Sequence, residues 1–278
     1  MGQIEWPDGT ADTATDFAVV AQQDFSSTQT FIRTIAQKPG REVVLFIHGY
    51  NTTPSEALHR FAQVSHDLQI SIPKLLFAWP SAGIATGYVY DRDSVLFSRD
   101  ALADLLTALS RETNKEVRLI AHSMGAHLTM EVLRQLAISG RRDVLNKISS
   151  LALLAPDSDP DIFRAQAQAT MPLPDPFVIM TTQNDRALNA SAFINIGRQK
   201  VGDLSRAEDI EAFDITIFDF TALADGSNRD HLVPFTSPAA ISVLRNLVQS
   251  GERGRPDLSQ FTLGVDGIFR AKPSGARG

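Results

Sequence analysis

The stretch VRLIAHSMGAHLTMEVLRQL, residues 117–136, constrains the fold more than any other part of this 278-residue chain. Its first five residues form an apolar run that predicts a buried strand, and apolar residues return further on at helical spacing. Ser123 therefore lies on a predicted strand-to-helix turn, between Ala121 and Gly125. This is the G-x-S-x-G pattern of a nucleophile elbow, with alanine in the first position. An ordinary helix N-cap is the alternative for Ser123, but this context favours a catalytic nucleophile.

Composition excludes several classes of function. The chain has no cysteine, which excludes disulfides, thiolate catalysis and cysteine-ligated metals. Its net charge of −6 argues against a surface that binds nucleic acid or an anionic membrane. No apolar run approaches the roughly 18 residues that span a bilayer, so we expect no stable membrane insertion. The first ten residues lack the features of a signal peptide. We therefore expect a soluble, cytoplasmic protein, with export open if a signal was removed.

Apolar runs alternate with amphipathic stretches from end to end, which predicts an α/β fold with a mostly parallel sheet and helices on both faces. We expect strands over 17–25, 43–47, 74–79, 117–121, 148–154, 177–182 and 215–220. We expect helices around 31–36, 54–68, 102–109, 128–136, 161–169 and 238–250. Residues 1–251 are predicted to form a single domain with an irregular lead-in over 1–15. The tail, 252–278, is rich in Gly and Arg and is expected to be partly docked or mobile.

In such sheets ligands bind at the carboxyl ends of the strands, so polar residues just after strands are the candidate site residues. The α/β-hydrolase order is Ser, then acid, then His. Among the histidines only His231 follows the last strands, which favours it as the base over an ordinary exposed loop histidine. Asp185 is our choice for the acid. Asp157 is the runner-up, and its alternative role is to cap the helix that starts near residue 160. Asp230 is too close to His231 in sequence to be an easy partner.

Acyl transfer also needs an oxyanion hole, in which two backbone N–H groups point to where negative charge develops. The elbow supplies one from Met124. The second is expected from the loop after the strand at 43–47, with the Tyr50 N–H as donor. Gly49 allows backbone to approach substrate closely. His48 is expected to be a packed, hydrogen-bonded residue that shapes this loop.

Neither a metal nor a cofactor is predicted. His122 and His127 are five residues apart across a strand-helix junction, unlike the i, i+4 histidine pair of a zinc-binding helix. His59 and His66 are expected to be solvated on an amphipathic helix. The segment GRQKVGD, residues 197–203, lacks the spacing of a phosphate-binding loop.

Six ordered motifs together resemble a known group. They are VLFIHGYN, FAWPSAG, GYVYDRD, AHSMG, LLAPDSD and NDRAL. The combination resembles the bacterial α/β-hydrolase family catalogued as domain of unknown function nine hundred, strongly over about residues 42–188 and more weakly elsewhere. The resemblance implies the α/β-hydrolase fold, carboxylester hydrolase activity and a triad of Ser123, Asp185 and His231. In this group a polar-aromatic pair often follows the histidine, whereas Leu232 follows here and makes that side of the pocket more apolar.

Aromatic residues gather around the predicted site. Tyr50, Tyr88 and Tyr90 are the three tyrosines of the chain and are expected on loops at the carboxyl ends of strands, with Trp79 beside them. An aromatic rim suits apolar acyl or aryl groups, although these residues could equally well only pack the loops. The segment 157–176 is short for a cap domain. A partly open site that favours short or medium acyl chains is therefore expected.

These features predict a serine carboxylester hydrolase that acts on a small-molecule ester through an acyl-enzyme. An acyltransferase, an amidase or a lactonase of the same fold would share every motif. A non-catalytic binding protein is the alternative of another class, because fold alone does not imply function. The sequence does not predict the oligomeric state.

Overall fold

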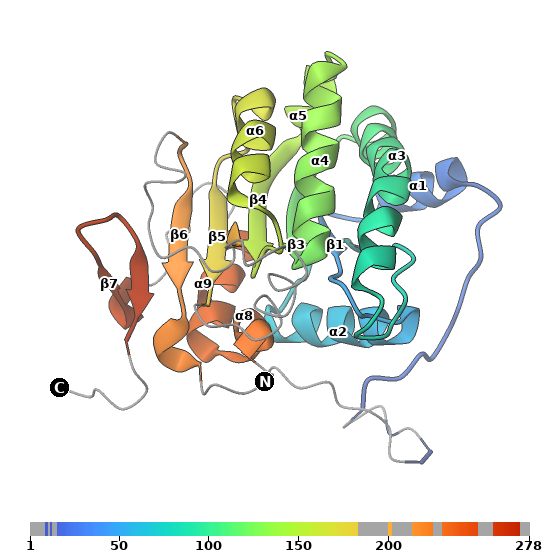
Figure 1. Ribbon diagram of the computed structural model, residues 1–278. Helices are drawn as coiled ribbons and strands as arrows, with labels where there is room; N and C mark the ends of the chain where they lie inside the picture. The colour runs from blue at the N-terminus through green and yellow to red at the C-terminus, as the bar shows by residue number, and fades with distance from the viewer. Residues whose placement is uncertain are drawn as a thin grey trace.

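A computed structural model of the chain describes residues 9–10, 12, 16–182, 200–201, 213–224, 230–249 and 258–272 (Figure 1). In these residues an eight-stranded sheet has the order β2-β1-β3-β4-β5-β6-β8-β7. Neighbouring strands are parallel except for the antiparallel pair β7 and β8. The strands are β1 Glu42–Ile47, β2 Lys74–Phe77, β3 Glu116–His122, β4 Ile148–Leu154, β5 Phe177–Thr181, β6 Thr216–Asp219, β7 Phe261–Leu263 and β8 Phe269–Ala271. The predicted α/β fold with a mostly parallel sheet is confirmed.

Helices cover both faces of this sheet (Figure 1). The α-helices are α1 Thr28–Gln37, α2 Pro54–Asp67, α3 Tyr88–Glu112, α4 Met124–Ile138, α5 Arg142–Leu145, α6 Pro160–Thr170, α8 Val233–Thr236 and α9 Pro238–Gln249. Short 3₁₀ turns are η3 Thr221–Leu223, η4 Asp230–Leu232 and η5 Leu258–Gln260. Helices α1, α3, α4, α5 and α6 pack on one face, and α2, α8 and α9 pack on the other. Because side chains alternate along a strand, successive residues of β1 enter the two cores in turn.

Caps fix where the helices begin. Thr53 and Glu56 form a capping box at the start of α2, with Pro54 in its first turn. The sequence also suggested Asp157 as the cap of α6, and this was wrong. Asp159 caps α6, because its carboxylate accepts hydrogen bonds from the first backbone N–H groups of the helix.

Two other predictions on the fold were wrong. Residues 17–25 form no strand; Val19 and Val20 are 63% and 79% exposed. A strand needs a partner for its backbone, and none of the described strands pairs with these residues. Tyr88 and Tyr90 were predicted on a loop, but they lie in the first turn of α3. That helix begins after Gly87 with no side-chain cap, so the sequence carries no start signal there.

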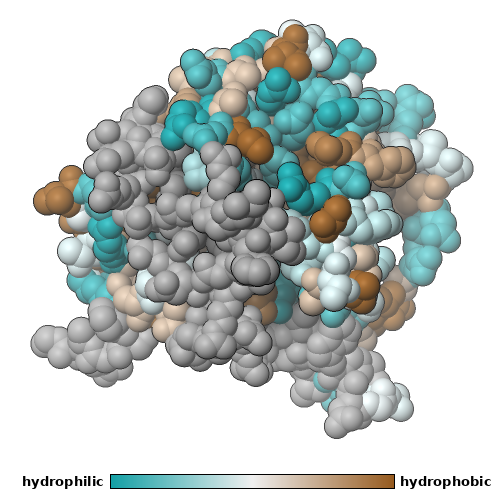
Figure 2. All heavy atoms as spheres, in the orientation of Figure 1, coloured by the Kyte–Doolittle hydropathy of each residue, from teal (hydrophilic) through white to brown (hydrophobic). Residues whose placement is uncertain are grey.

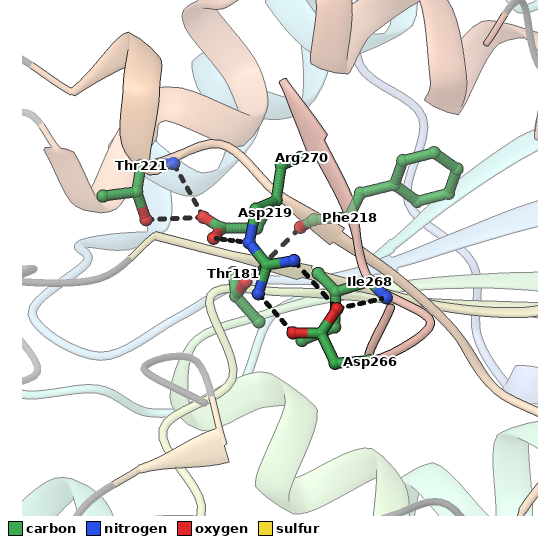
Figure 3. Close-up of polar contacts among 7 residues, drawn as sticks. All are labelled: Thr181, Phe218, Asp219, Thr221, Asp266, Ile268 and Arg270. Atoms are coloured by element: carbon green, nitrogen blue, oxygen red, sulfur yellow. Dashed lines mark hydrogen bonds and ion pairs between the residues drawn. The ribbon is translucent and has the colours of Figure 1, made fainter. Parts of the chain in front are cut away.

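The hairpin of β7 and β8 extends the sheet beyond β6 (Figure 3). Arg270 on β8 donates to both carboxylate oxygens of Asp266 in the hairpin turn, at 2.8 and 2.5 Å. The same guanidinium lies 3.8 Å from a carboxylate oxygen of Asp219 at the end of β6. Phe261 is buried and packs edge-on against Phe218. An arginine between two aspartates therefore attaches the hairpin to the sheet.

The surface is that of an ordinary folded chain. Over the described part of the face in Figure 2, hydrophobic residues lie dispersed among hydrophilic ones, which is normal for a protein surface. Within the described ranges, none of the helices is long and apolar enough to cross a membrane.

Candidate functional site

Ser123 occupies the turn between β3 and α4 in a strained backbone conformation. Its φ of 53° and ψ of −123° are rare for a residue with a side chain. Backbone hydrogen bonds hold this conformation: the Ser123 N–H donates to Leu154, and the Ser123 carbonyl accepts from Ala126 and Asp157. A strained serine at the carboxyl end of a central strand is the geometry of a nucleophile elbow. The predicted strand-turn-helix context of Ser123 is confirmed.

Two glycines allow backbone segments to meet at this turn. A Cβ atom on Gly125 would lie 2.3 Å from the carbonyl oxygen of His48, so only glycine lets α4 approach the end of β1. A Cβ atom on Gly49 would lie 2.7 Å from Nδ1 of His122 and 2.9 Å from Cβ of Ser123. The loop after β1 therefore lies directly against the elbow.

Two backbone N–H groups at this junction have no hydrogen-bond acceptor among the described residues. Met124 is the first residue of α4, and the first N–H groups of a helix have no acceptor within the helix. Tyr50 belongs to the loop that Gly49 brings against Ser123, and its hydroxyl donates to the carbonyl of Ala85 at 2.5 Å. Both are the donors that the sequence predicted for an oxyanion hole, and their assignment stays a prediction.

His48 shapes the loop after β1, as its sequence context predicted. Its ring is buried and stacks on Trp79 with the centroids 5.0 Å apart. Nδ1 lies 2.8 Å from the carbonyl of Gly49, and Nε2 lies 3.1 Å from the backbone nitrogen of Trp79. The Trp79 indole donates back to the His48 carbonyl. Burial lowers the pKa of His48, so the ring is neutral and holds the two loops together.

Asp91 ties the same two loops to α3, and sequence reasoning missed this role. Its side chain is fully buried in the first turn of α3. One carboxylate oxygen accepts from the Asn51 N–H at 3.0 Å and from the Ser81 hydroxyl at 2.6 Å. The other accepts from the Ala82 N–H at 2.6 Å. The only signal in the sequence was the GYVYDRD motif, which names the residue but not its contacts.

His231, the predicted base, lies beside the elbow. The Nε2 atom of His122 is 3.3 Å from the carbonyl oxygen of His231, and the two rings are 4.7 Å apart between centroids. Because a carbonyl only accepts, Nε2 of His122 carries the hydrogen. Burial, together with the neighbouring His231, holds the pKa of His122 well below its ordinary value. A neutral His122, the residue before Ser123, thus links the elbow to the backbone of His231.

Asp157, the runner-up acid, is engaged in a buried ion pair. Its carboxylate lies 2.8 Å from the ammonium of Lys200, and both side chains are more than nine-tenths buried. The Tyr88 hydroxyl donates to the same carboxylate at 3.2 Å. Burial opposes the charged form of Lys200, but the attraction of Asp157 and the hydrogen bonds outweigh it and raise the pKa of Lys200. Nothing in the sequence marked Lys200. Asp185 lies outside the described residues.

The predicted aromatic residues occupy different environments. Tyr50 is partly buried and packs edge-on against Tyr88, with the centroids 5.5 Å apart. Tyr88 is buried, whereas Tyr90 is 58% exposed. Leu232 is partly buried against the core on the side of α8 and α9. Within the ranges that the structure describes, no cluster of three or more His, Asp or Glu side chains is arranged to hold a metal ion.

Sequence comparisons find a family and a relative of this chain. The model of the family described as alpha/beta hydrolase of unknown function (DUF900) matches residues 23–250. An uncharacterized protein from Nostoc sp. is 26% identical over 137 residues, which is 40% of this chain and 36% of that protein. This chain thus aligns with about a third of the length of that relative.

Two solved structures are similar to this chain. Lipase B of Aspergillus fumigatus has 12% identity and a TM-score of 0.53, over 80% of this chain and 55% of the lipase. A dienelactone hydrolase from Anabaena variabilis has 17% identity and a TM-score of 0.42, over 75% of this chain and 83% of that enzyme. At such identities the similarity to lipase B supports the fold.

We expect Asp91→Asn to destabilise the protein by about 1–3 kcal/mol, because an amide cannot accept from all three donors and its NH₂ group faces another N–H. Asp93→Asn is the matched control. Asp93 lies two residues further along the same helix and is exposed, so its replacement should change stability by less than about 0.5 kcal/mol. Urea unfolding of the three proteins measures both. Equal stability of the two variants would contradict the role given to Asp91.

Proposed function

The chain belongs to the family of alpha/beta hydrolases of unknown function (DUF900), and on that premise we propose that it is a serine carboxylester hydrolase. One observation carries the proposal: Ser123 sits in a strained turn at the carboxyl end of β3, against two N–H groups that lack acceptors in the described residues. A serine of this kind can attack an ester carbonyl, and the two N–H groups can hold the resulting oxyanion.

The proposed reaction has two halves. His231 takes the proton of Ser123 as its oxygen attacks the ester carbonyl, and the N–H groups of Tyr50 and Met124 stabilise the tetrahedral oxyanion. The intermediate collapses to an acyl-enzyme, and the imidazolium gives its proton to the departing alcohol. A water molecule, activated by the same histidine, then hydrolyses the acyl-enzyme and releases Ser123.

Asp185 is the proposed acid that orients His231 and stabilises its imidazolium. It follows β5, the strand before the one that leads to His231, in the order expected for this fold. The contacts of Asp157 support this choice, because Lys200 and Tyr88 already engage its carboxylate. Diverting Asp157 to a histidine would leave the buried ammonium of Lys200 without its partner, which is costly.

Short or medium acyl chains are the proposed substrates. Helix α6 fills most of the segment after β4, and its Phe163 is fully buried in the main core. This segment is therefore part of the sheet's cover and does not form a cap over the site. The aromatic pair of Tyr50 and Tyr88 beside the elbow suits a compact group.

Replacement of the nucleophile tests the reaction type. A fluorophosphonate probe should label the wild-type protein and should not label Ser123→Ala. Hydrolysis of p-nitrophenyl acetate should fall by about 10³-fold or more, because the attacking oxygen is gone. Mass spectrometry of the labelled peptide identifies the modified residue. A wild type that resists the probe, or a label that persists in the variant, would sink the proposal.

The acid assignment predicts that Asp185→Asn lowers turnover of p-nitrophenyl acetate by about 10²–10⁴-fold with the fold intact. Asp157→Asn should instead lower stability by about 3–5 kcal/mol, because Lys200 keeps a buried charge. Its turnover per molecule labelled by the probe should fall less than about tenfold.

A double variant, Asp157→Asn with Lys200→Gln, separates catalysis from stability for this residue. It removes both charges and should regain part of the lost stability. Loss of turnover in both Asp157 proteins, together with near-normal turnover in Asp185→Asn, would transfer the acid role to Asp157.

A series of p-nitrophenyl esters, from acetate through butanoate and octanoate to palmitate, measures the acyl-chain preference. We expect kcat/KM to be highest at acetate or butanoate and to fall towards palmitate, since α6 provides no cap that would cover a long chain. The series is read with a detergent-free assay below the solubility limit of each ester. An optimum at palmitate would contradict the expected open site.

A further inference from the structure

We infer that a pocket beside Met124 is a specificity subsite for an uncharged hydrogen-bonding group of the ester substrate, such as a hydroxyl or an amide. We call it the Lys200 pocket; its walls include Met124, His127, Asp157, Ser158, Ile162 and Lys200. The inference rests on the proposed hydrolase function, because it names a further part of the substrate that this site would hold.

The pocket shares Met124 with the proposed oxyanion hole. Met124, whose N–H is one proposed donor, forms part of its wall, and His127 lies about one turn further along α4. Tyr88 at the start of α3 and Ser158 before α6 form other walls. These helices follow β2, β3 and β4, so their first turns all lie at the carboxyl edge of the sheet. A substituent of an ester bound at Ser123 is therefore within reach of the pocket.

Its size limits what can enter. The cavity has a volume of about 210 Å³, which is below the roughly 300–1,000 Å³ of ordinary ligand pockets. This is room for a small substituent but not for a long acyl chain. The backbone also closes one side, because the Val201 N–H donates to the carbonyl of Ser158 at 2.9 Å and fixes the segment that carries Lys200.

The wall carries two cationic side chains, Lys200 and Arg92, and two carboxylates, Asp157 and Asp159, so its formal charges cancel, which favours an uncharged ligand over a charged one. Lys200 pairs with Asp157, and Tyr88 binds both through its hydroxyl. The carboxylate of Asp159 caps α6. Burial lowers the pKa of His127, so its imidazole adds no charge. A charged substituent would compete with a buried ion pair and lose its own hydration. An uncharged group avoids both costs.

Two buried polar atoms that belong to residues of the wall lack partners. The hydroxyl of Ser158 and Nδ1 of His127 are buried and form no hydrogen bond among the residues that the structure describes. Ser158 is only 2% exposed. Nearly all buried polar groups in folded proteins are hydrogen-bonded, so two such atoms in one cavity wall point to a ligand. A hydroxyl or an amide both donates and accepts, which matches a serine hydroxyl and an imidazole nitrogen.

Matched pairs of esters test the subsite. On the acyl side, p-nitrophenyl butanoate is compared with p-nitrophenyl 3-hydroxybutanoate; on the alcohol side, ethyl acetate is compared with 2-hydroxyethyl acetate. We expect kcat/KM to favour the hydroxylated member of at least one pair by about fivefold or more, because it gains hydrogen bonds in the pocket. Equal values within both pairs would overturn the subsite.

Two serine variants show whether the Lys200 pocket causes the preference. In Ser158→Ala the ratio should fall close to one, while the Tm should stay the same or rise, because the lost hydroxyl had no partner in the free protein. Ser98→Ala is the matched control. Ser98 is also a buried serine without a partner, on α3 but not in the pocket wall, and its variant should keep the wild-type ratio.

The outcomes separate this inference from the proposed function. The subsite is overturned if the kcat/KM ratio of the ester pair is unchanged in Ser158→Ala, or if Ser98→Ala loses the preference to the same extent. Fluorophosphonate labelling of Ser123 would still support the hydrolase function in either case. Absence of labelling in the wild type overturns both.

Discussion

The arrangement of the site depends on one close approach, that of α4 to the end of β1. Gly125 lets the first turn of α4 pass over the carbonyl of His48, where any Cβ atom would collide with backbone. Because β1 and β3 are neighbours in the sheet, this contact places the loop after β1 against the turn after β3. This steric condition brings Ser123 and Met124 against the loop that carries Tyr50. The chemistry proposed for the protein needs these three groups together.

Buried carboxylates then hold the elements around that contact. Asp91 accepts from two loops at once, and Asp157 neutralises Lys200 and accepts from Tyr88. A carboxylate without such partners would be costly to bury, so each one fixes the position of the groups that surround it. Both aspartates lie at the carboxyl edge of the sheet, where the sequence also places the proposed triad. The same type of residue therefore serves a structural role here and a catalytic role in the proposed triad. The hydrogen-bond and ion-pair partners of each aspartate distinguish the two roles.

This explains which parts could be predicted from sequence. Apolar runs identified the strands of the central sheet, because a strand buried on both faces leaves a continuous signal. Residues 17–25 carry a similar run but no partner strand, and pairing is not a local property. The same limit applies to Asp91 and Lys200. Asp91 contacts Asn51 and Lys200 contacts Asp157, and the two partners of each pair are 40 or more residues apart in the sequence. No spacing rule predicts such contacts. Ser123 was predictable because its whole signal lies within one turn.

The two neighbouring histidines show how packing can prepare a residue for the proposed chemistry. In the proposed reaction His231 becomes a cation during each half, and a second cation beside it would oppose that step. His122 lies in ring contact with His231, yet burial holds the pKa of His122 well below its ordinary value and keeps it neutral. Its hydrogen on Nε2 is directed to the carbonyl of His231. His122 can thus fix the position of the proposed base without adding a charge that would oppose its protonation.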